Sequence, residues 1–375
     1  MKIMFDARAY AGSASGVGKS VYNLLHALAM YDKQNEYVVI TNNPSLFKFN
    51  IPHSISFLQS PYRIDQHPLR ELWERYVLLK KITDLKINLY FSPSFSFPFG
   101  LNNLSKLKKV VAIDDLTAFD YPETMKLLFR YYMRWVIKNS VSMADMVTVI
   151  SDFMYHEVIS RFGFLKSRVV SIPLGPGAFL DFDKAPVDIE HAKKTYALPD
   201  NYVLAVGNVE PRKNIKRLIN AMVINWEKGM LSHVVLVGKM YANEKSFINI
   251  IPQKYRKNIH FTGYVSEEDL PSLYAGAVTF VFPSLYEGFG LPILEAMVCR
   301  VPVITSNKGS MLEISGNAAL HVDPLNSNEI AGAIEKVVNE KEIKDELIQK
   351  GMQRVQKYSW NEAAQKHIQL FNAVA

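Results

Sequence analysis

The stretch that most constrains the fold of this chain is residues 279–297, TFVFPSLYEGFGLPILEAM. Strand-forming residues run from Thr279 to Phe282, a glycine-containing loop follows, and Pro292 opens an apolar pattern of helical period. The first turn of such a helix presents unpaired backbone N–H groups and a partial positive charge. In open α/β sheets, the loop at the carboxyl end of a strand is where ligands bind. The stretch therefore predicts a ligand-binding strand–loop–helix unit.

Two carboxylates, Glu287 and Glu295, bracket this turn with seven residues between them. Gly288 and Gly290 let the loop backbone approach a ligand closely. Both acids can face one cavity, which suits an anionic ligand rich in hydroxyl groups. Solvated acids on an ordinary connection would give the same spacing, but the intervening GFGLP argues against that interpretation.

The rest of the chain alternates short apolar runs with amphipathic segments, and the pattern is built twice. Strands are expected at 2–5, 37–41, 89–92, 109–113, 146–150, 202–206, 233–237, 258–262, 278–282 and 303–305. Helices are expected at 18–31, 68–82, 123–143, 151–162, 213–226, 266–276, 291–299, 327–339 and 341–357. The expected fold class is α/β, with two Rossmann-like domains whose mainly parallel sheets face a central cleft. The Pro/Gly-rich region 173–200 is the expected boundary.

Composition places the protein among globular chains, and its charge is uneven. Its 375 residues are 49% hydrophobic and 21% charged, with a single cysteine, Cys299. One cysteine permits no disulfide framework, and MKIMFDARAY is typical of a first strand and not of a signal peptide, so a cytoplasmic location is expected. Residues 1–180 hold 21 Lys+Arg against 14 Asp+Glu, whereas residues 181–375 hold 22 of each. The basic half suggests an anionic partner surface.

A basic turn follows the strand expected at 202–206, in the segment GNVEPRKN. Arg212 and Lys213 place a forked donor and a point charge beside a helix start, where a diphosphate could lie. A solvated basic turn is the alternative. Together with the glycine loop at 287–291, the basic turn favours phosphate binding over this alternative.

Two further segments carry weaker indications. SASGVGKS resembles a nucleotide-binding P-loop, but five residues separate Gly12 from Gly18 where the pattern requires four, so ATPase chemistry is not expected. Asp114 and Asp115 end an apolar strand, a catalytic position in α/β enzymes, although aspartates there also cap turns. The histidines do not cluster at metal-ligand spacing, so no metal is expected. No recognition motif supports nucleic-acid binding.

Residues 123–139, ETMKLLFRYYMRWVIKN, carry Lys126, Arg130, Arg134 and Lys138 at strict i, i+4 spacing. Aromatic and aliphatic residues flank this basic stripe, as in helices that lie on an anionic membrane surface. A core-packed helix with a solvated basic face is the competing interpretation, and the sequence pattern alone favours it slightly.

Taken together, these motifs resemble family 4 of the retaining, nucleotide-sugar-dependent glycosyltransferases, which have the GT-B fold. The resemblance covers nearly the whole chain and rests on the SGVG loop, VVAIDDLTAFDYPE, VGNVEPRKN, FTGYVSEEDL, PSLYEGFGLPILEAM and VPVITSNKGSMLEISGNAALHVDP. The segments EPRKN and SNKGSMLEISGNAAL look most like bacterial mannosyl- and rhamnosyl-type transferases of surface polysaccharides. The resemblance implies an acceptor-side domain at 1–175, a nucleotide-sugar-binding domain at 176–357, and a C-terminal helix at 358–375 that crosses back to the first domain.

The resemblance also assigns roles to individual residues. Arg212 and Lys213 would hold the donor diphosphate, and Glu295 would bind the ribose hydroxyls. Catalytic roles would fall to Glu287 and Asp114. The remaining donor-binding positions would be Gly288, Phe289, Gly290 and Leu291 in the glycine loop, Tyr264 and Val265 beside the base, and Gly16, Val17 and Gly18 near the phosphates.

One position departs from the family pattern, which usually has His-Asp-Leu where this chain has Asp114-Asp115-Leu116. The expected function is retaining transfer of a hexose, GDP-mannose being the first donor expected, to a glycan or lipid-linked acceptor in bacterial surface polysaccharide or lipopolysaccharide synthesis. The donor would be a cosubstrate, and no cofactor is expected. Because of Asp114, the alternative is a catalytically weakened homologue that acts as a membrane-associated scaffold of an assembly complex.

Overall fold

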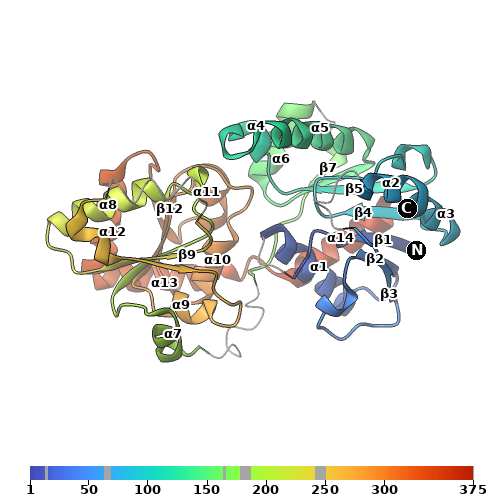
Figure 1. Ribbon diagram of the computed structural model, residues 1–375. Coiled ribbons are helices and arrows are strands. Elements are labelled where there is room, and N and C mark those ends of the chain that lie inside the picture. The colour runs from blue at the N-terminus through green and yellow to red at the C-terminus, as the bar shows by residue number, and fades with distance from the viewer. Residues whose placement is uncertain (13–15, 63–68, 164–165, 178–186, 241–250, 375) are drawn as a thin grey trace. The chain divides into compact units, whose positions relative to one another are not determined.

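The computed structural model describes residues 1–12, 16–62, 69–163, 166–177, 187–240 and 251–374 (Figure 1). The chain divides into two compact units. Unit 1 comprises Met1–Gly175 together with Ser359–Ala375, and unit 2 comprises Pro176–Tyr358. The last 17 residues therefore belong to the same unit as the N-terminal half.

Unit 1 is built on a seven-stranded sheet in which every strand pairs in parallel with its neighbours. The strand order is β3-β2-β1-β4-β5-β6-β7. The strands are β1 (Lys2–Asp6), β2 (Glu36–Thr41), β3 (Ile55–Gln59), β4 (Leu89–Ser92), β5 (Lys108–Ile113), β6 (Met146–Val149) and β7 (Val169–Ser171). Because β1 and β4 are neighbours, the order reverses between them, and their carboxyl ends form the expected ligand position.

Helices connect these strands and flank the sheet, with α1 and α5 on opposite sides (Figure 1). They are α1 (Gly16–Tyr31), α2 (Leu69–Trp73), α3 (Leu79–Asp84), α4 (Thr117–Asp120), α5 (Leu127–Met143), α6 (Asp152–Phe162) and α14 (Trp360–Val374), with a π-helical turn, η2 (Glu74–Leu78), between α2 and α3. Helix α14 packs against α1. Its buried face includes Trp360, Ala364 and Phe371, and Phe371 lies 5.1 Å from Phe91 of β4 between ring centroids.

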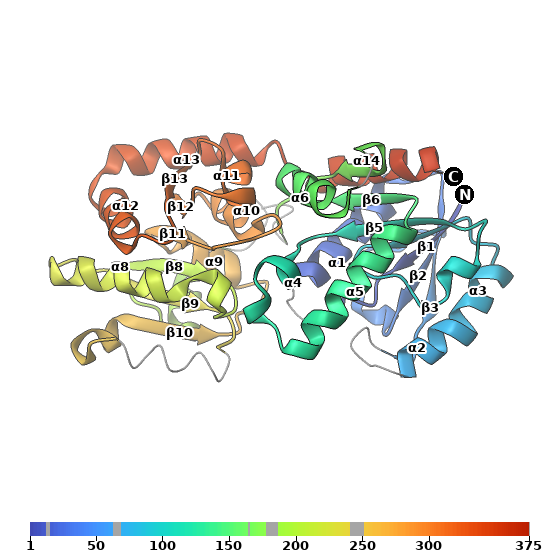
Figure 2. The ribbon, with the colours of Figure 1, turned by 90° about the horizontal axis from the view of Figure 1, so that it is seen from above.

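Unit 2 repeats the plan with six parallel strands in the order β10-β9-β8-β11-β12-β13. The strands are β8 (Tyr202–Val206), β9 (His233–Val237), β10 (Ile259–Gly263), β11 (Thr279–Phe282), β12 (Val303–Ser306) and β13 (Ala319–Val322). The helices are α7 (Ile189–Tyr196), α8 (Ile215–Glu227), α9 (Leu270–Ala275), α10 (Leu291–Val298), α11 (Gly309–Ser315), α12 (Ser327–Asn339) and α13 (Lys341–Val355). Helices α8 and α12 pack as one pair and α10 and α13 as another (Figure 2).

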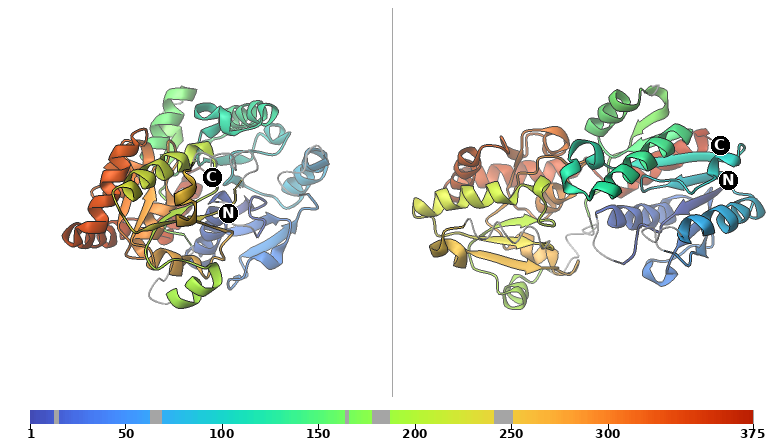
Figure 3. Two further views of the ribbon diagram at one scale, coloured as in Figure 1. Left: turned by 60° about the vertical axis from the view of Figure 1, so that its left-hand side comes forward. Right: turned by 45° about the horizontal axis from the view of Figure 1, so that its top comes forward.

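The core of each unit is built on strands that are apolar along most of their length, as is typical of a parallel sheet covered by helices on both faces. Strands such as His233–Val237 are almost continuously buried, as expected where helices cover both sides (Figure 3). In unit 2 the aliphatic residues of β8 and β9 join those of α8 and α12 in one cluster that includes Val203, Leu218, Val234 and Ile334. This burial fixes the strand ends from which the loops of the site project.

The predicted α/β class with two mainly parallel, Rossmann-like sheets is confirmed. Each of the ten predicted strands is present, but β3, β7 and β13 were not predicted. The helix expected at 123–143 begins only at Leu127. The basic stripe on it is also not uniformly exposed, because Arg134 donates hydrogen bonds to the carbonyl oxygens of Ala118 and Phe119. In the described part of the chain, no helix has the length and apolarity needed to cross a membrane.

Candidate active site

The loops at the centre of unit 2 leave two neighbouring strands, β8 and β11, at the point where the strand order reverses. After β8 the chain runs through Gly207 to the 3₁₀ turn η6 (Pro211–Lys213), and α8 then begins. After β11 it runs through Pro283 to Gly290, and α10 then begins. The carboxyl ends of parallel strands lie at one edge of a sheet, so the two loops meet.

Three charged side chains from these loops form one cluster. Lys213 Nζ lies 2.6 Å from Glu287 Oε1, and Arg212 Nη1 lies 2.7 Å from Glu287 Oε2. Glu287 thus binds one cation with each carboxylate oxygen. Its side chain is 12% exposed, as is that of Lys213, while Arg212 is 18% exposed and also reaches Glu210 at 3.5 Å. The structure brings together the predicted catalytic acid and both predicted diphosphate ligands.

The electrostatics of the cluster are dominated by burial and by this pairing. Burial raises the pKa of Glu287, but the attraction of Arg212 and Lys213 outweighs it and lowers the pKa to about 2. Burial lowers the pKa of Lys213 below its ordinary value, and Glu287 opposes this change. Lys213 Nζ also lies 4.7 Å from the centroid of the Phe282 ring, a cation–π contact. Glu287 is therefore ionised and holds two cations at the strand ends.

Hydrogen bonds from neighbouring elements hold the glycine loop in place. The Ser310 hydroxyl of α11 donates to the Glu287 carbonyl oxygen at 2.6 Å, and the Leu285 N–H donates to the Arg212 carbonyl oxygen at 2.8 Å. Asn214, at φ +59°, donates through its amide to the carbonyl oxygens of Pro283 and Pro324 at 2.9 and 2.6 Å. Sequence reasoning gave Ser310 and Asn214 no role. The only sequence signal for Asn214 is that Asn tolerates the left-handed backbone conformation better than most residues do.

Two glycines let the first loops after β8 and β9 approach each other. A Cβ on Gly238 would lie 2.3 Å from the Gly207 carbonyl oxygen, closer than any side chain permits. Both glycines have positive φ, +137° at Gly207 and +135° at Gly238. Gly238 was not predicted as part of the site, because a lone glycine after a strand carries little information.

The other predicted residues of the glycine loop have structural contacts of their own. Gly290 adopts φ +113° at the start of α10, and the buried Phe289 ring packs edge-on against Tyr358 at 5.8 Å. Leu291 opens the helix, and Gly288 lies directly after Glu287. Glu295, about one turn into α10, is buried and accepts a hydrogen bond from the Tyr274 hydroxyl at 3.0 Å. Glu287 and Glu295 therefore have different partners.

The remaining donor-binding predictions fall elsewhere. Tyr264 and Val265 follow β10, which β9 separates from β8; Tyr264 is 56% exposed and Val265 is buried. Gly16, Val17 and Gly18 form the first turn of α1 in unit 1, and Gly18 is buried. Residues 13–15 of the same expected loop lie outside the described residues. A Cβ on Gly16 would meet no heavy atom within 4 Å.

Asp114 follows β5 in unit 1 and lines a small, mainly apolar cavity. Ser20, Phe91, Thr148, Leu174 and His367 are among its other lining residues. Burial, with a smaller contribution from the charge of Asp115, raises the pKa of Asp114 to about 8. Among the described residues no cation pairs with its carboxyl group. Asp114 is therefore mainly neutral at pH 7, a state the sequence pattern did not predict.

His367 of α14 and Thr148 of β6 are lining residues that sequence reasoning missed. His367 Nδ1 lies 2.8 Å from the Ala363 carbonyl oxygen, and burial lowers its pKa to about 4. The Thr148 hydroxyl is buried without a hydrogen-bond partner in the part of the chain described. Both residues lie in elements separated from Asp114 in the sequence, so no local motif could have placed them there.

Comparisons with known proteins agree with this architecture. The family described as glycosyl transferases group 1 matches residues 187–354, and the family described as glycosyltransferase family 4 matches residues 14–175. The chain belongs to the family 4 glycosyltransferases, which have the GT-B fold. The two matches cover the two units separately, the first falling in unit 2 and the second in unit 1.

Relatives of this glycosyltransferase include O-antigen chain mannosyltransferase B of Escherichia coli. It is 29% identical over 99% of this chain and 99% of its own length. The serotype-specific mannosyltransferase WbdA of the same organism is 33% identical over 61% of this chain, a region that spans 29% of the relative. These similarities support a transferase of polysaccharide biosynthesis.

Solved structures share the fold of this glycosyltransferase. Sucrose-phosphate synthase of Thermosynechococcus elongatus superimposes with a TM-score of 0.79 at 22% identity, covering 100% of this chain and 98% of that one. HepE of Anabaena, solved with UDP and glucose, gives a TM-score of 0.74 at 17% identity over the full length of both chains. In the described ranges, no group of three or more His, Cys, Asp or Glu residues is arranged to hold a metal ion.

Proposed function

We propose that this transferase moves a hexose from a nucleoside-diphosphate sugar, GDP-mannose first among the candidates, to a glycan or lipid-linked acceptor with retention of configuration. The setting would be synthesis of a bacterial cell-surface polysaccharide such as the O-antigen of lipopolysaccharide. Two relatives named as O-antigen or serotype-specific mannosyltransferases support the sugar and the setting. The structural neighbour solved with UDP and glucose keeps UDP-sugars as the next candidates.

The cluster of Arg212, Lys213 and Glu287 is the observation that carries the proposal. It places a guanidinium and an ammonium 2.7 and 2.6 Å from one carboxylate at the carboxyl ends of β8 and β11. A guanidinium has five N–H donors and an ammonium three, so each can serve Glu287 and a phosphate oxygen together. Preorganised cations of this kind stabilise the negative charge that develops on a departing diphosphate.

The proposed chemistry needs no dedicated protein base. The acceptor hydroxyl attacks the anomeric carbon on the face from which the diphosphate leaves, so the bond from that carbon to the phosphate oxygen breaks as the new glycosidic bond forms. The acceptor proton passes to the leaving phosphate oxygen. The protein's main contribution is then charge stabilisation and positioning.

Asp114 occupies the position at which the family pattern has a histidine that contacts the donor sugar. We propose that Asp114 acts in its neutral form and donates a hydrogen bond to a sugar hydroxyl. Its burial and the absence of a paired cation in the described residues support this role. A neutral carboxyl group replaces a donor function that a carboxylate would lack.

The proposal extends to partners and location. Contact between residues 123–139 and an anionic membrane would place the enzyme in the cytoplasm at the inner membrane face, close to a lipid-linked acceptor. The i, i+4 cations of this segment motivate that part of the proposal.

The test combines binding and product analysis. A panel of nucleotide sugars is screened by thermal shift, because a ligand that binds the folded state raises the unfolding temperature. The best donor is then used in a transfer reaction whose product is examined by NMR for anomeric configuration. Stabilisation by GDP-mannose and a retained α-configuration support the proposal. An inverted product overturns the mechanism, and a chain that binds no donor supports the scaffold alternative.

A further inference from the structure

Two segments of unit 1 expose large apolar side chains. In the first half of α5, Leu127, Leu128, Tyr131 and Trp135 are 59, 84, 57 and 49% exposed. In the segment from α2 through η2, Leu69, Leu72 and Tyr76 are 57, 54 and 66% exposed. Single exposed apolar residues are ordinary, but a group of this size on neighbouring segments marks an interaction site.

Several of the exposed residues follow helical spacing, although Leu127 and Phe129, on either side of Leu128, are also exposed. Leu128, Tyr131, Trp135 and the exposed Lys138 are spaced by three, four and three residues, which places them on one face of α5. Leu69, Leu72, Tyr76 and Lys80 are spaced by three, four and four residues along the segment that contains the π-helical turn. The buried faces consist of other residues, including Val136, Ile137 and Val141 in α5 and Leu78 and Ile82 in the other segment. Trp135 also stacks on Phe99 at 5.5 Å between ring centroids, yet half of its surface stays exposed.

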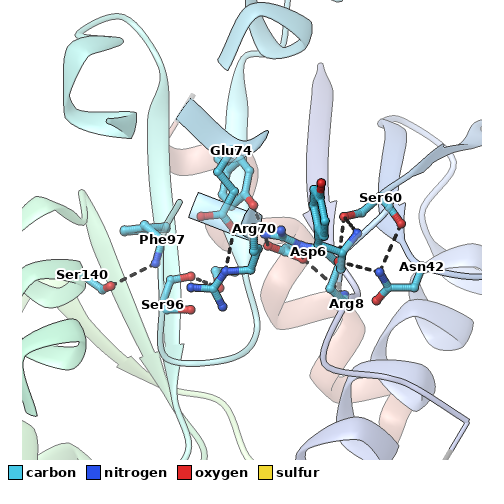
Figure 4. A network of polar contacts seen from close by, with 12 residues as sticks. Asp6, Arg8, Asn42, Ser60, Arg70, Glu74, Ser96, Phe97 and Ser140 are labelled. Carbon is cyan, nitrogen blue, oxygen red and sulfur yellow. Dashed lines mark hydrogen bonds and ion pairs between the residues drawn. The ribbon is translucent and has the colours of Figure 1, made fainter. Parts of the chain in front are cut away.

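A polar network links the two segments to each other and to the sheet, and Figure 4 shows its buried part around Arg70, Glu74 and Asp6. Arg70 of α2 donates a hydrogen bond to the Tyr132 hydroxyl of α5 at 3.1 Å and lies 3.4 Å from Glu74. Glu74 lies 2.8 Å from Arg8, which binds Asp6 at the end of β1 through two hydrogen bonds of 2.8 and 2.6 Å.

Arg70 and Glu74 point into this network from the same segment that exposes Leu72 and Tyr76. The π-helical turn η2, which begins at Glu74, inserts an extra residue into the helical turn, a feature frequent at functional sites. The network thereby fixes the direction in which the apolar residues project.

The exposed charged residues of the two segments are mainly cations. Within residues 69–84 and 126–143 the exposed cations are Arg75, Lys80, Lys81, Lys126 and Lys138. The acids in these ranges are Glu71, which is half-buried, Glu74, which is buried, and Asp84, which is exposed at the end of α3. Arg134 does not contribute, because it is bound to the carbonyl oxygens of Ala118 and Phe119.

We propose that α5 and the α2–η2–α3 segment form a single surface that docks on an anionic lipid bilayer. Aromatic side chains such as Trp135, Tyr131 and Tyr76 are suited to the level of the lipid headgroups, and the lysines to their phosphates. A symmetric dimer through this face would bring the same cations of two copies together, which opposes self-association. The charge pattern thus favours a lipid surface over a second copy.

This inference rests on the membrane contact proposed above, from which it takes the anionic lipid as partner. It replaces the linear stripe of residues 126–138 by a surface built from two segments. It does not depend on the transfer reaction. Donor binding, followed by thermal shift with GDP-mannose, serves as the separate readout. If the protein does not bind vesicles but still shows the donor shift, the docking surface is wrong and the proposed enzymatic function stands. If it binds vesicles but shows no donor shift, the proposed enzymatic function is wrong and the docking surface stands.

The experiment measures co-sedimentation of the full chain with vesicles of phosphatidylcholine, with or without phosphatidylglycerol. We expect binding to the anionic vesicles only, weakening with salt. Leu72→Asp in one segment and Leu128→Asp in the other should each weaken binding about tenfold or more. Leu231→Asp, at an 88% exposed position in unit 2, is the matched control and should bind as the wild type does. Charge reversal at Lys80 and Lys138 should reduce binding as well.

Three results would overturn the proposal. The first is no binding to anionic vesicles at low salt. The second is loss through Leu128→Asp with Leu72→Asp unchanged, which would reduce the surface to α5 alone. The third is a concentration-dependent dimer in light scattering that Leu128→Asp dissociates, which would assign the face to a second copy.

Discussion

Glu287 and Lys213 meet at 2.6 Å although 74 positions separate them in the sequence, and this pairing joins the loops after β8 and β11. Arg212 binds the other carboxylate oxygen of Glu287, so the acid is a structural partner of both proposed diphosphate ligands. Removal of Glu287 would leave two like charges side by side in a largely buried position. Its role in the free protein is therefore to assemble the cationic site.

The pairing predicts that Glu287 stabilises the fold in a pH-dependent way. The pKa of Glu287 is lowered to about 2 from its ordinary value of 4.5. Its contribution is therefore fully present above pH 4.5 and is lost as the pH falls toward 2. Glu287→Gln should lower the free energy of unfolding at pH 7 by on the order of 2–3 kcal/mol. Urea unfolding of both proteins at pH 7 and at acidic pH checks this, since the difference should shrink in acid.

Asp114 predicts a pH dependence of the opposite sign. Its folded pKa of about 8 lies above the ordinary 3.8, so the folded state holds the proton more tightly and loses stability as the pH rises from 4 to 8. Asp114→Asn removes this loss and should be more stable than the wild type at pH 8 by a few kcal/mol, on the order of one kcal/mol per pKa unit. Thermal unfolding across this pH range provides the measurement.

The same residue predicts a pH profile of transfer. If neutral Asp114 donates to the sugar, the rate should fall above about pH 8 in the wild type and this decline should be absent in Asp114→Asn. Asp115→Asn is the matched variant, because it removes the neighbouring charge that helps raise the Asp114 pKa while keeping an acceptor for the Thr117 N–H. The decline should then begin at lower pH. A wild-type rate that rises through pH 8 with no effect of either substitution argues against the neutral donor.

The contact between Gly207 and Gly238 predicts a sharp difference between two glycine substitutions. Gly238→Ala puts a Cβ 2.3 Å from a carbonyl oxygen at φ +135°, and it should destabilise unit 2 by about 1–3 kcal/mol and disturb the loop before Arg212. Gly332→Ala in α12 meets no heavy atom within 4 Å and should stabilise the helix by about 0.5–1 kcal/mol. Unfolding midpoints in denaturant would show the opposite signs, and equal effects would contradict the backbone contact.

The central strands and long helices could be predicted because buried parallel strands are continuous apolar runs, as in Tyr202–Val206. The strands that escaped prediction lie at sheet edges: β3 and β7 end the first sheet and β13 ends the second. An edge strand has one neighbour and is less buried, so ISFLQ in β3 and the three residues of β7 lack a clear pattern. Helix α9 begins at Leu270, later than predicted, with Pro271 in its first turn.

The local sequence was sufficient to locate the two loops of the site. It was insufficient to predict which side chains from distant segments become neighbours. The turn at 211–213 and the loop at 287–291 could be located from glycine, proline and charge. That Glu287 pairs with both cations, or that His367 lines the cavity of Asp114, depends on which strands and helices become neighbours. Periodicity likewise placed Arg134 on a basic stripe but could not show its bonds to Ala118 and Phe119.

The most direct test of the account measures kcat/KM for sugar transfer in Arg212→Ala and Lys213→Ala beside Lys228→Ala. Lys228 also forms a 2.6 Å ion pair, with Glu335, but on the exposed surface of unit 2, so it controls for loss of an ordinary salt bridge. We expect a fall of about 10²–10³ for the two site variants, because each removes a charge that we propose stabilises the leaving diphosphate, and near-wild-type transfer for Lys228→Ala. Near-normal transfer by a folded Lys213→Ala protein would contradict it.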